Sequence, residues 1–179
     1  MLSAPDVEHV LRLAERAPSP PDEVLVGASA AALEGFEART GLRLSADFRH
    51  WLLAVNGATL GPGGLFGVRD ARDFLSIEGI LKIYPDWVDR GWIPIAADGV
   101  GNYWVTAMGP DSTDGWVAFV DTHQDPEVLQ SYVASSVLHF LSFLLTAELG
   151  EPGWPAHRDH VVALDAAMAG VPDELAPWR

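Results

Sequence analysis

The chain has 179 residues, and 49% of them are hydrophobic, which is enough to fill the core of one globular domain and excludes wholesale disorder. Asp and Glu total 25 against 11 Lys and Arg, and the resulting net charge of −14 disfavours a free-standing nucleic-acid binder. The lack of cysteine excludes disulfides, thiol nucleophiles and cysteine-ligated zinc.

The N-terminal region is predicted to form a short amphipathic helix followed by a linker. Hydrophobic residues from Val7 to Ala14 follow helical spacing, with Ser3 as a candidate N-cap and Asp6 favourable to the helix dipole. The prolines within residues 18–21 must end this helix. The chain start has no basic segment and no long apolar stretch, so we expect no secretory signal and a cytoplasmic location.

Two capped helices are predicted next. Ser29 caps the first, which ends at Gly41, and Ser45 caps the second, which ends at Asn56-Gly57. Beyond them we expect a short strand, a further helix and a turn, at residues 65–68, 73–83 and 87–91.

Three closely spaced strands are predicted at residues 92–97, 103–108 and 116–121. Connections this short permit only antiparallel pairing, and the apolar residues on both sides predict a meander covered on both faces. An apolar helix over residues 133–149 supplies one cover, and a last helix opens at Pro155. The fold class is therefore α+β.

Candidate catalytic and metal-binding groups are sparse. Asp98, Asp121 and His123 could serve a hydrolase, but acids at strand ends more often form turns. His157 and His160 have a spacing that could hold a metal, but no third ligand is evident. We therefore expect no enzymatic activity, no cofactor and no metal.

Tryptophan and charge are unevenly distributed. Most of the seven tryptophans are expected in the core, whereas Trp87 and Trp178 lie in less patterned sequence and are candidate exposed binding anchors. Between Gly91 and His157 there is no Lys or Arg, whereas eight Asp and Glu residues occur there. This bias indicates either general solubility or an acidic face that steers a basic partner.

Four stretches of the sequence resemble the signatures of the SUKH superfamily, the Smi/Knr-type domains. The resembling residues are Leu33-x-x-Phe36-Glu37-x-x-Thr40-Gly41-Leu42-x-Leu44-Ser45-x-Asp47-Phe48-x-x-Trp51-Leu52 with Asn56-Gly57, then Trp92-Ile93-Pro94-Ile95-Ala96-x-Asp98-Gly99-x-Gly101-Asn102-Tyr103, Gly115-Trp116-Val117-Ala118-Phe119-Val120-Asp121 and Val133-Ala134-Ser135-Ser136-Val137-x-x-Phe140-Leu141. Ser45 stands where the family usually has proline, and Val137 stands where it usually has an aromatic residue. The resemblance divides the chain into a Smi/Knr-type domain at residues 28–149, a preceding helix and linker at 1–27, and a helical extension at 150–179.

The resemblance implies a non-catalytic α+β domain of the bacterial toxin-immunity branch. Such a protein would bind and neutralise a cognate toxin, often a nuclease, by blocking its basic active surface as a monomer or a dimer. Because a nuclease surface is basic, an acidic protein can associate with it rapidly. Nucleic acid and membranes are not expected as direct partners.

Loop acids near an aromatic anchor are the predicted contacts with this partner: Asp86, Trp87, Asp89, Asp111, Asp114, Asp125 and Glu127. The alternative is a regulatory or scaffold module of the Smi/Knr type without a toxin partner. In that case the proline-rich linker and the terminal helices would be docking elements.

Overall fold

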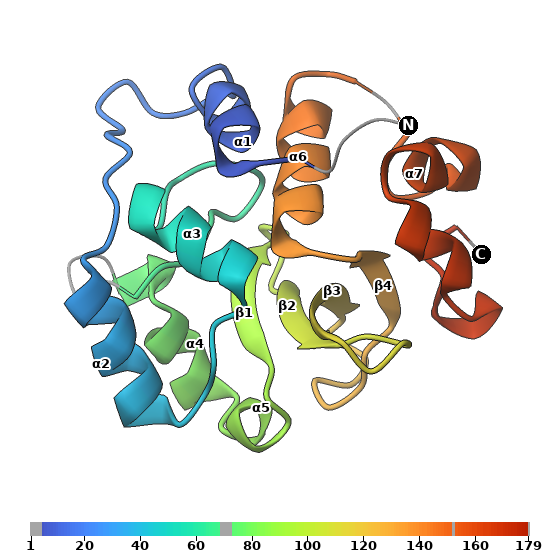
Figure 1. The fold of residues 1–179 in the computed structure, drawn as a ribbon. Coiled ribbons are helices and arrows are strands. Elements are labelled where there is room, and N and C mark those ends of the chain that lie inside the picture. Colours follow the sequence, from blue (N-terminus) through green and yellow to red (C-terminus); the bar gives the residue numbers. More distant parts are fainter. Residues whose placement is uncertain (1–4, 69–72, 152, 179) are drawn as a thin grey trace.

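An antiparallel four-stranded sheet with strand order β1-β2-β3-β4 organises the computed structural model, which describes residues 5–68, 73–151 and 153–178 (Figure 1). The elements are α1 (Val7–Ala14), α2 (Ala30–Thr40), α3 (Ala46–Ala54), η1 (Asp73–Leu75), α4 (Ile77–Ile83), α5 (Asp86–Asp89), β1 (Ile93–Ala97), β2 (Tyr103–Met108), β3 (Asp114–Val120), β4 (Ser131–Ala134), α6 (Val137–Glu148), α7 (Arg158–Leu164), η2 (Ala166–Gly170) and η3 (Asp173–Leu175). The predicted α+β class is confirmed.

The sheet is covered on both faces, as its sequence predicted. On one face Trp104 packs against Phe140 of α6, with ring centroids 5.4 Å apart. On the other face Tyr103 meets the edge-on rings of Tyr84 and Trp87, both at 5.7 Å. Consecutive residues of β1, β2 and β3 are buried for this reason, instead of alternating with exposed ones.

Side-chain caps fix the starts of five of the described helices, α1, α2, α3, α4 and α6. The hydroxyls of Ser29 and Ser45 accept hydrogen bonds from the amides three residues further on, which confirms both predicted N-caps. Gly41 ends α2 with φ +75°, as predicted. The N-cap of α1 is Asp6, whose carboxylate accepts the His9 amide, and the predicted cap Ser3 lies outside the described residues.

Several predicted elements differ from the structure. The helix expected over residues 73–83 is α4, which begins only at Ile77, and the turn expected at residues 87–91 is preceded by α5 at Asp86–Asp89. Val133 and Ala134, predicted to open the helix over residues 133–149, belong to strand β4, so α6 begins at Val137 with Ser136 as its N-cap. Pairing with β3 explains this difference, because Ala118 lies opposite Tyr132. The last helix begins at Arg158 and not at Pro155. Residues 65–68 contribute only isolated bridges.

The C-terminal segment packs on the same core as the sheet. The Trp154 indole donates a hydrogen bond to the Val133 carbonyl at 3.0 Å and stacks on Phe143. Asp165, which is 2% exposed, accepts both the amide and the hydroxyl of Ser135, at 2.7 and 2.6 Å. These bonds fasten residues beyond α6 to the strand β4 and the start of α6.

A half-buried ion pair joins α2 to α3. Glu37 accepts the Leu44 amide at 3.0 Å and the Arg49 guanidinium at 2.7 Å. The pKa of Glu37 lies below its ordinary value. The hydrogen bond from the Leu44 amide is the main cause, and the positive charge and hydrogen bond of Arg49 add to it. The loop between the two helices is fixed by this carboxylate.

We expect Glu37→Gln to lose about 1–2 kcal/mol of unfolding free energy at pH 7, because it removes charge-assisted hydrogen bonds. A carboxylate with a lowered folded pKa stabilises above its unfolded pKa of about 4.3, and the stabilisation is lost as pH falls through the folded pKa. The difference from wild type should therefore shrink below about pH 4 in urea titrations. The exposed Glu34→Gln on the same helix is the matched control, and equal pH profiles of the two variants would contradict the prediction.

Asp165→Asn should destabilise the chain by about 1–3 kcal/mol, because one carboxylate oxygen that accepts a Ser135 donor becomes an NH2 group. Limited proteolysis should also cut the segment between α6 and α7 faster than in wild type. The exposed Asp173→Asn is the control. Unchanged urea midpoints and cleavage rates would show that this contact does not hold the C-terminal segment.

Candidate functional site

A solvent-open hollow of about 230 Å³ lies at the end of the sheet where β2 finishes and β3 begins. Its walls come from the α2–α3 loop, from α5 with the turn after it, and from the two strand ends. The lining residues are Gly41, Leu42, Arg43, Ser45, Val88, Asp89, Gly91, Thr106, Ala107, Asp114 and Gly115.

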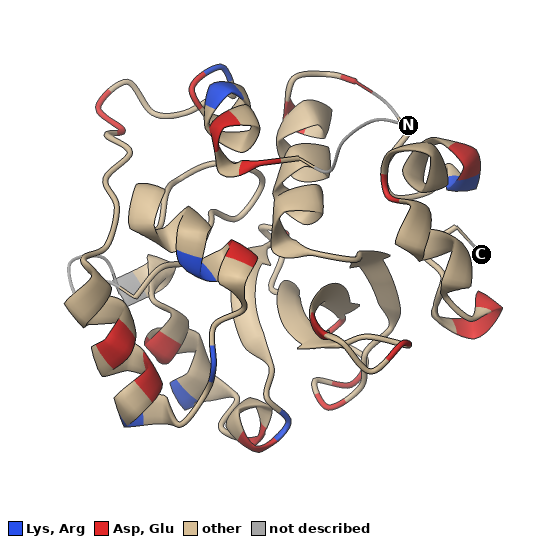
Figure 2. Ribbon diagram, in the orientation of Figure 1, with Lys and Arg blue, Asp and Glu red and all other residues tan. Residues whose placement is uncertain are grey.

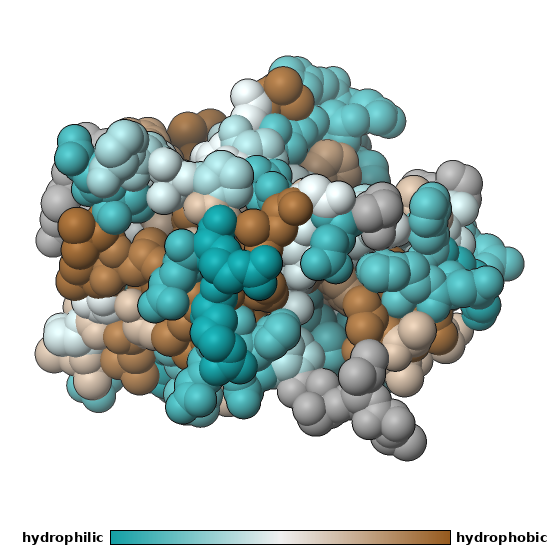
Figure 3. All heavy atoms as spheres, turned by 90° about the horizontal axis from the view of Figure 1, so that it is seen from above, coloured by the Kyte–Doolittle hydropathy of each residue, from teal (hydrophilic) through white to brown (hydrophobic). Residues whose placement is uncertain are grey.

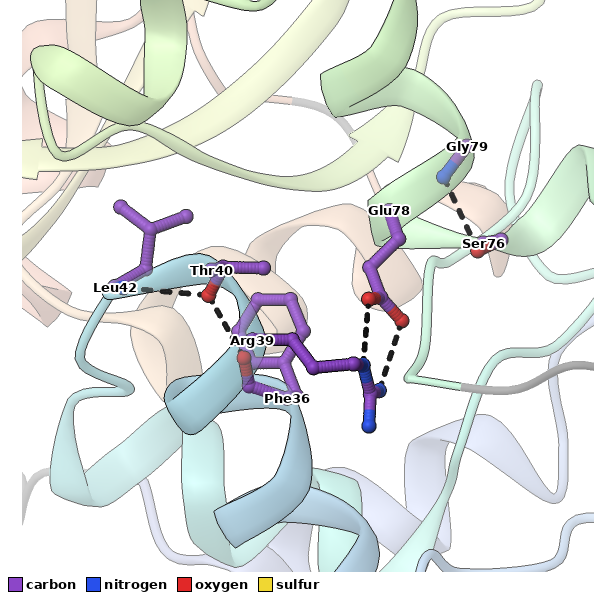
Figure 4. A network of polar contacts seen from close by, with 7 residues as sticks. All are labelled: Phe36, Arg39, Thr40, Leu42, Ser76, Glu78 and Gly79. Carbon is purple, nitrogen blue, oxygen red and sulfur yellow. Dashed lines mark hydrogen bonds and ion pairs between the residues drawn. The ribbon is translucent and has the colours of Figure 1, made fainter.

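Local hydrogen bonds shape the α2–α3 side of this hollow. The Thr40 hydroxyl donates to the Phe36 carbonyl at 2.8 Å and accepts the Leu42 amide at 3.2 Å (Figure 4). Gly115 allows the loop to come close to β3, because a Cβ there would lie 3.0 Å from the Ser45 Cβ. The wall is therefore set by backbone turns and does not depend on long side chains.

A bidentate ion pair holds α2 against α4. The Arg39 guanidinium donates to both carboxylate oxygens of Glu78, each at 3.0 Å (Figure 4). The hydrogen bond from Arg39 is the main cause that lowers the pKa of Glu78. This pair steadies the helix whose end carries the hollow's first wall.

The predicted anchor Trp87 is not exposed. It is 1% exposed, stacks on Tyr84 at 4.6 Å and donates its indole N–H to the Pro126 carbonyl at 2.7 Å. The prediction of an exposed indole is wrong because the loop between β3 and β4 folds back over α5. Trp178 is partly buried, with the Arg158 guanidinium 5.9 Å from its ring.

Exposed hydrophobic side chains occur both near α5 and the end of β2, at Ile83 and Met108, and on the linker and α3. Val24, Val26 and Leu53 are exposed, and the Asn56 amide bonds to the Val26 carbonyl, so the linker runs beside the end of α3. Figure 3 shows hydrophobic atoms at the left of the upper face, on the side where this linker runs in Figure 1.

Three of the predicted contact acids already have partners within the chain. Asp111 accepts hydrogen bonds from the hydroxyl and the amide of Thr113. Both bonds lower the pKa of Asp111, and the bond from the hydroxyl has the larger effect. Asp125 accepts the Glu127 amide at 2.8 Å. Glu127 pairs at 2.8 Å with Arg90, whose guanidinium also lies 5.2 Å from the Trp92 ring.

The other three acids, Asp86, Asp89 and Asp114, are exposed. Their carboxylates make no hydrogen bond or ion pair with any residue that the structure describes. Asp89 and Asp114 line the hollow, and Asp86 lies on α5 with Asp89. Figure 2 shows acidic segments on α5 and on the loops that adjoin the sheet. The structure thus brings two predicted acids into one site.

The residues considered for hydrolysis form turns. Asp98 accepts the amides of Val100 and Asn102, each at 2.9 Å, and the Asn102 side chain at 2.8 Å. Asp121 accepts the His123 amide at 3.0 Å, and the His123 ring contacts the Val100 carbonyl at 2.8 Å. These bonds occupy the groups that a general acid or base would use.

A serine–histidine–aspartate cluster occurs at the start of α6. The Ser136 hydroxyl lies 3.1 Å from Nδ1 of His139, and Asp165 lies 4.0 Å from the same nitrogen. A catalytic relay needs the nucleophile and the acid on opposite ring nitrogens. Here Ser136 and Asp165 both lie on the Nδ1 side of His139, and the Ser136 hydroxyl is the N-cap of α6. The geometry is therefore that of a helix cap and not of a catalytic relay.

Among residues 5–68, 73–151 and 153–178 no group of three or more metal-ligating side chains converges. Within the same ranges no helix combines the length and apolarity needed to cross a membrane.

Thr106 and Arg43 line the hollow but did not emerge from the sequence patterns. Thr106 is a polar residue inside an otherwise apolar strand, and that interruption is the one signal that could have singled it out. Arg43 sits between two buried leucines and carries no local signal.

The hollow falls within the part of the chain that a known family matches. The model of the SMI1 / KNR4 family (SUKH-1) matches residues 27–142, which is more than half of the 179 residues. No curated protein matches the chain. The match includes the sheet through β4 and every residue that lines the hollow. The chain therefore belongs to the SMI1 / KNR4 family (SUKH-1).

Proposed function

We propose that the chain is an immunity protein that binds a cognate toxin domain, a nuclease, and blocks its basic active surface. SUKH domains are often toxin-immunity modules, are generally non-catalytic and typically bind protein partners. The proposal assigns this role to the side of the molecule that carries α5 and the β2–β3 hairpin.

The observation that carries the proposal is the set of exposed carboxylates without partners on that side, Asp86, Asp89 and Asp114. Exposed charges that stabilise nothing within the chain remain available to a partner. The nearby cation Arg90 is already engaged by Glu127 and by the Trp92 ring. Arg43 also lines the hollow with Asp89 and Asp114, so the charged residues of that lining sum to one negative charge.

Electrostatics explains why such a surface suits a nuclease. A nuclease binds phosphates, so its active surface carries Lys and Arg. Complementary charge steers two proteins together and raises the association rate by 10-fold or more at low salt. Blocking by coverage requires no chemistry from the inhibitor, which fits the turn-forming use of Asp98 and Asp121.

A regulatory or scaffold module without a toxin partner is the second candidate. Its docking elements would be the terminal helices. However, α1 buries Val10 and Leu13 in the core of the domain, and α7 buries Val161 there. These apolar residues are therefore already covered, so we rank this function second.

The first test is co-purification with the product of the neighbouring gene, followed by an assay of that product's toxicity. The triple variant Asp86→Asn, Asp89→Asn, Asp114→Asn should associate about tenfold more slowly at low ionic strength. The difference should largely disappear near 1 M salt, because screening removes long-range attraction. Stopped-flow association rates measure both effects.

The matched control is Glu15→Gln, Asp22→Asn, Asp173→Asn, which removes the same charge from exposed residues on other elements. It should associate nearly as fast as wild type. If both triple variants slow association equally, total charge and not this side of the molecule directs binding. If wild type neither binds nor protects against the toxin, the immunity function is wrong.

A further inference from the structure

We propose that the hollow between the α2–α3 loop, α5 and the β2–β3 hairpin receives an arginine side chain of the basic partner. This inference rests on the proposed function and names the group that the acidic side recognises.

Two unpartnered carboxylates reach the hollow from separate elements. Asp89 comes from α5, and Asp114 begins β3. Both line the hollow, both are exposed, and neither is engaged by a residue that the structure describes. A cation entering between these elements would therefore not have to displace an existing ion pair.

The Thr106 side chain supplies an independent reason to expect a ligand. Thr106 is 5% exposed and lines the hollow, yet its hydroxyl makes no hydrogen bond to the described part of the chain. Among the described residues only Trp51 has a fully buried polar side-chain atom without a partner, so the Thr106 hydroxyl touches solvent through the hollow and is free to accept a hydrogen bond. A donor from a bound side chain would satisfy it.

The shape and donor count favour arginine. A hollow of about 230 Å³ is smaller than the pockets of roughly 300–1,000 Å³ that hold drug-sized ligands. It is also open to solvent, so a long side chain of another protein can enter. Arginine carries five N–H donors in a planar fork, enough for two carboxylates and a hydroxyl together.

Arg43 should weaken the binding of an arginine side chain, so its removal should have the opposite effect to removal of an acid. It lines the hollow and also a neighbouring recess with Glu34 and Glu37. Its positive charge repels an incoming guanidinium. Removing that charge should therefore strengthen binding, whereas removing Asp89 or Asp114 should weaken it.

The experiment titrates the full chain with the peptide acetyl-Gly-Arg-Gly-amide and follows backbone amides by NMR. The control peptide replaces arginine with citrulline, which is neutral and nearly the same shape. We expect saturable shifts at Gly41, Thr106 and Gly115 with arginine, at millimolar affinity, and far smaller shifts with citrulline.

Variants then test each contact. Asp89→Asn and Asp114→Asn should each weaken the peptide about two- to five-fold, the range of an exposed ion pair, and Arg43→Gln should strengthen it. Thr106→Val keeps the shape, removes the unpaired hydroxyl and should weaken binding without lowering stability. Asp22→Asn, with the same charge change on the linker, should leave affinity unchanged.

The proposal is overturned if the shifts spread over all exposed acids, if citrulline binds equally well, or if Thr106→Val and Arg43→Gln have no effect. Those outcomes leave the immunity function standing, because a toxin could still bind the acidic side elsewhere. Conversely, arginine binding in the hollow without a toxin partner would remove the immunity function and keep the site.

Discussion

Burial of the sheet on both faces is the constraint on which the rest of the structure depends. Polar groups of the strands and turns must then find partners at the strand ends. At the end where β1 stops and β2 begins, Asp98 takes two backbone amides and orients Asn102, whose side-chain oxygen accepts the Thr122 amide at 3.1 Å. One carboxylate thus joins two turns.

This requirement separates the acidic residues into two kinds. Carboxylates that accept backbone donors, such as Asp98 and Asp121, hold the turns at one end of the sheet. Asp89 and Asp114 lie at the opposite end, near the start of β1 and β3. Their carboxylates accept no hydrogen bond from the described part of the chain. The net charge of −14 therefore overstates how many acids are available to a partner.

Local chemistry explains which elements the sequence could predict. Ser29, Ser45 and Gly41 act through neighbours within a few residues, so the ends that they set were predictable. The strand β4 was not, because it is only four residues long, lies two residues before the apolar helix α6 and is set by its pairing with β3. Trp87 was misjudged because its ring packs on Tyr103 of β2 and its indole N–H bonds to Pro126, contacts that exist only in the folded chain. The hollow itself is created by three segments that meet only in the folded chain.

The residues that shape the frame of the hollow differ from the charged and polar residues that line it. Gly41, Leu42, Ser45 and Gly115 lie in the stretches that resemble the family, and they set the frame through turns and close approach. The charged and polar lining residues, Arg43, Asp89, Thr106 and Asp114, lie at positions that the resemblance does not specify. Exposed polar substitutions typically change stability by less than about 0.5 kcal/mol. Arg43, Asp89 and Asp114 are exposed, so substitutions there should leave the frame of the hollow intact.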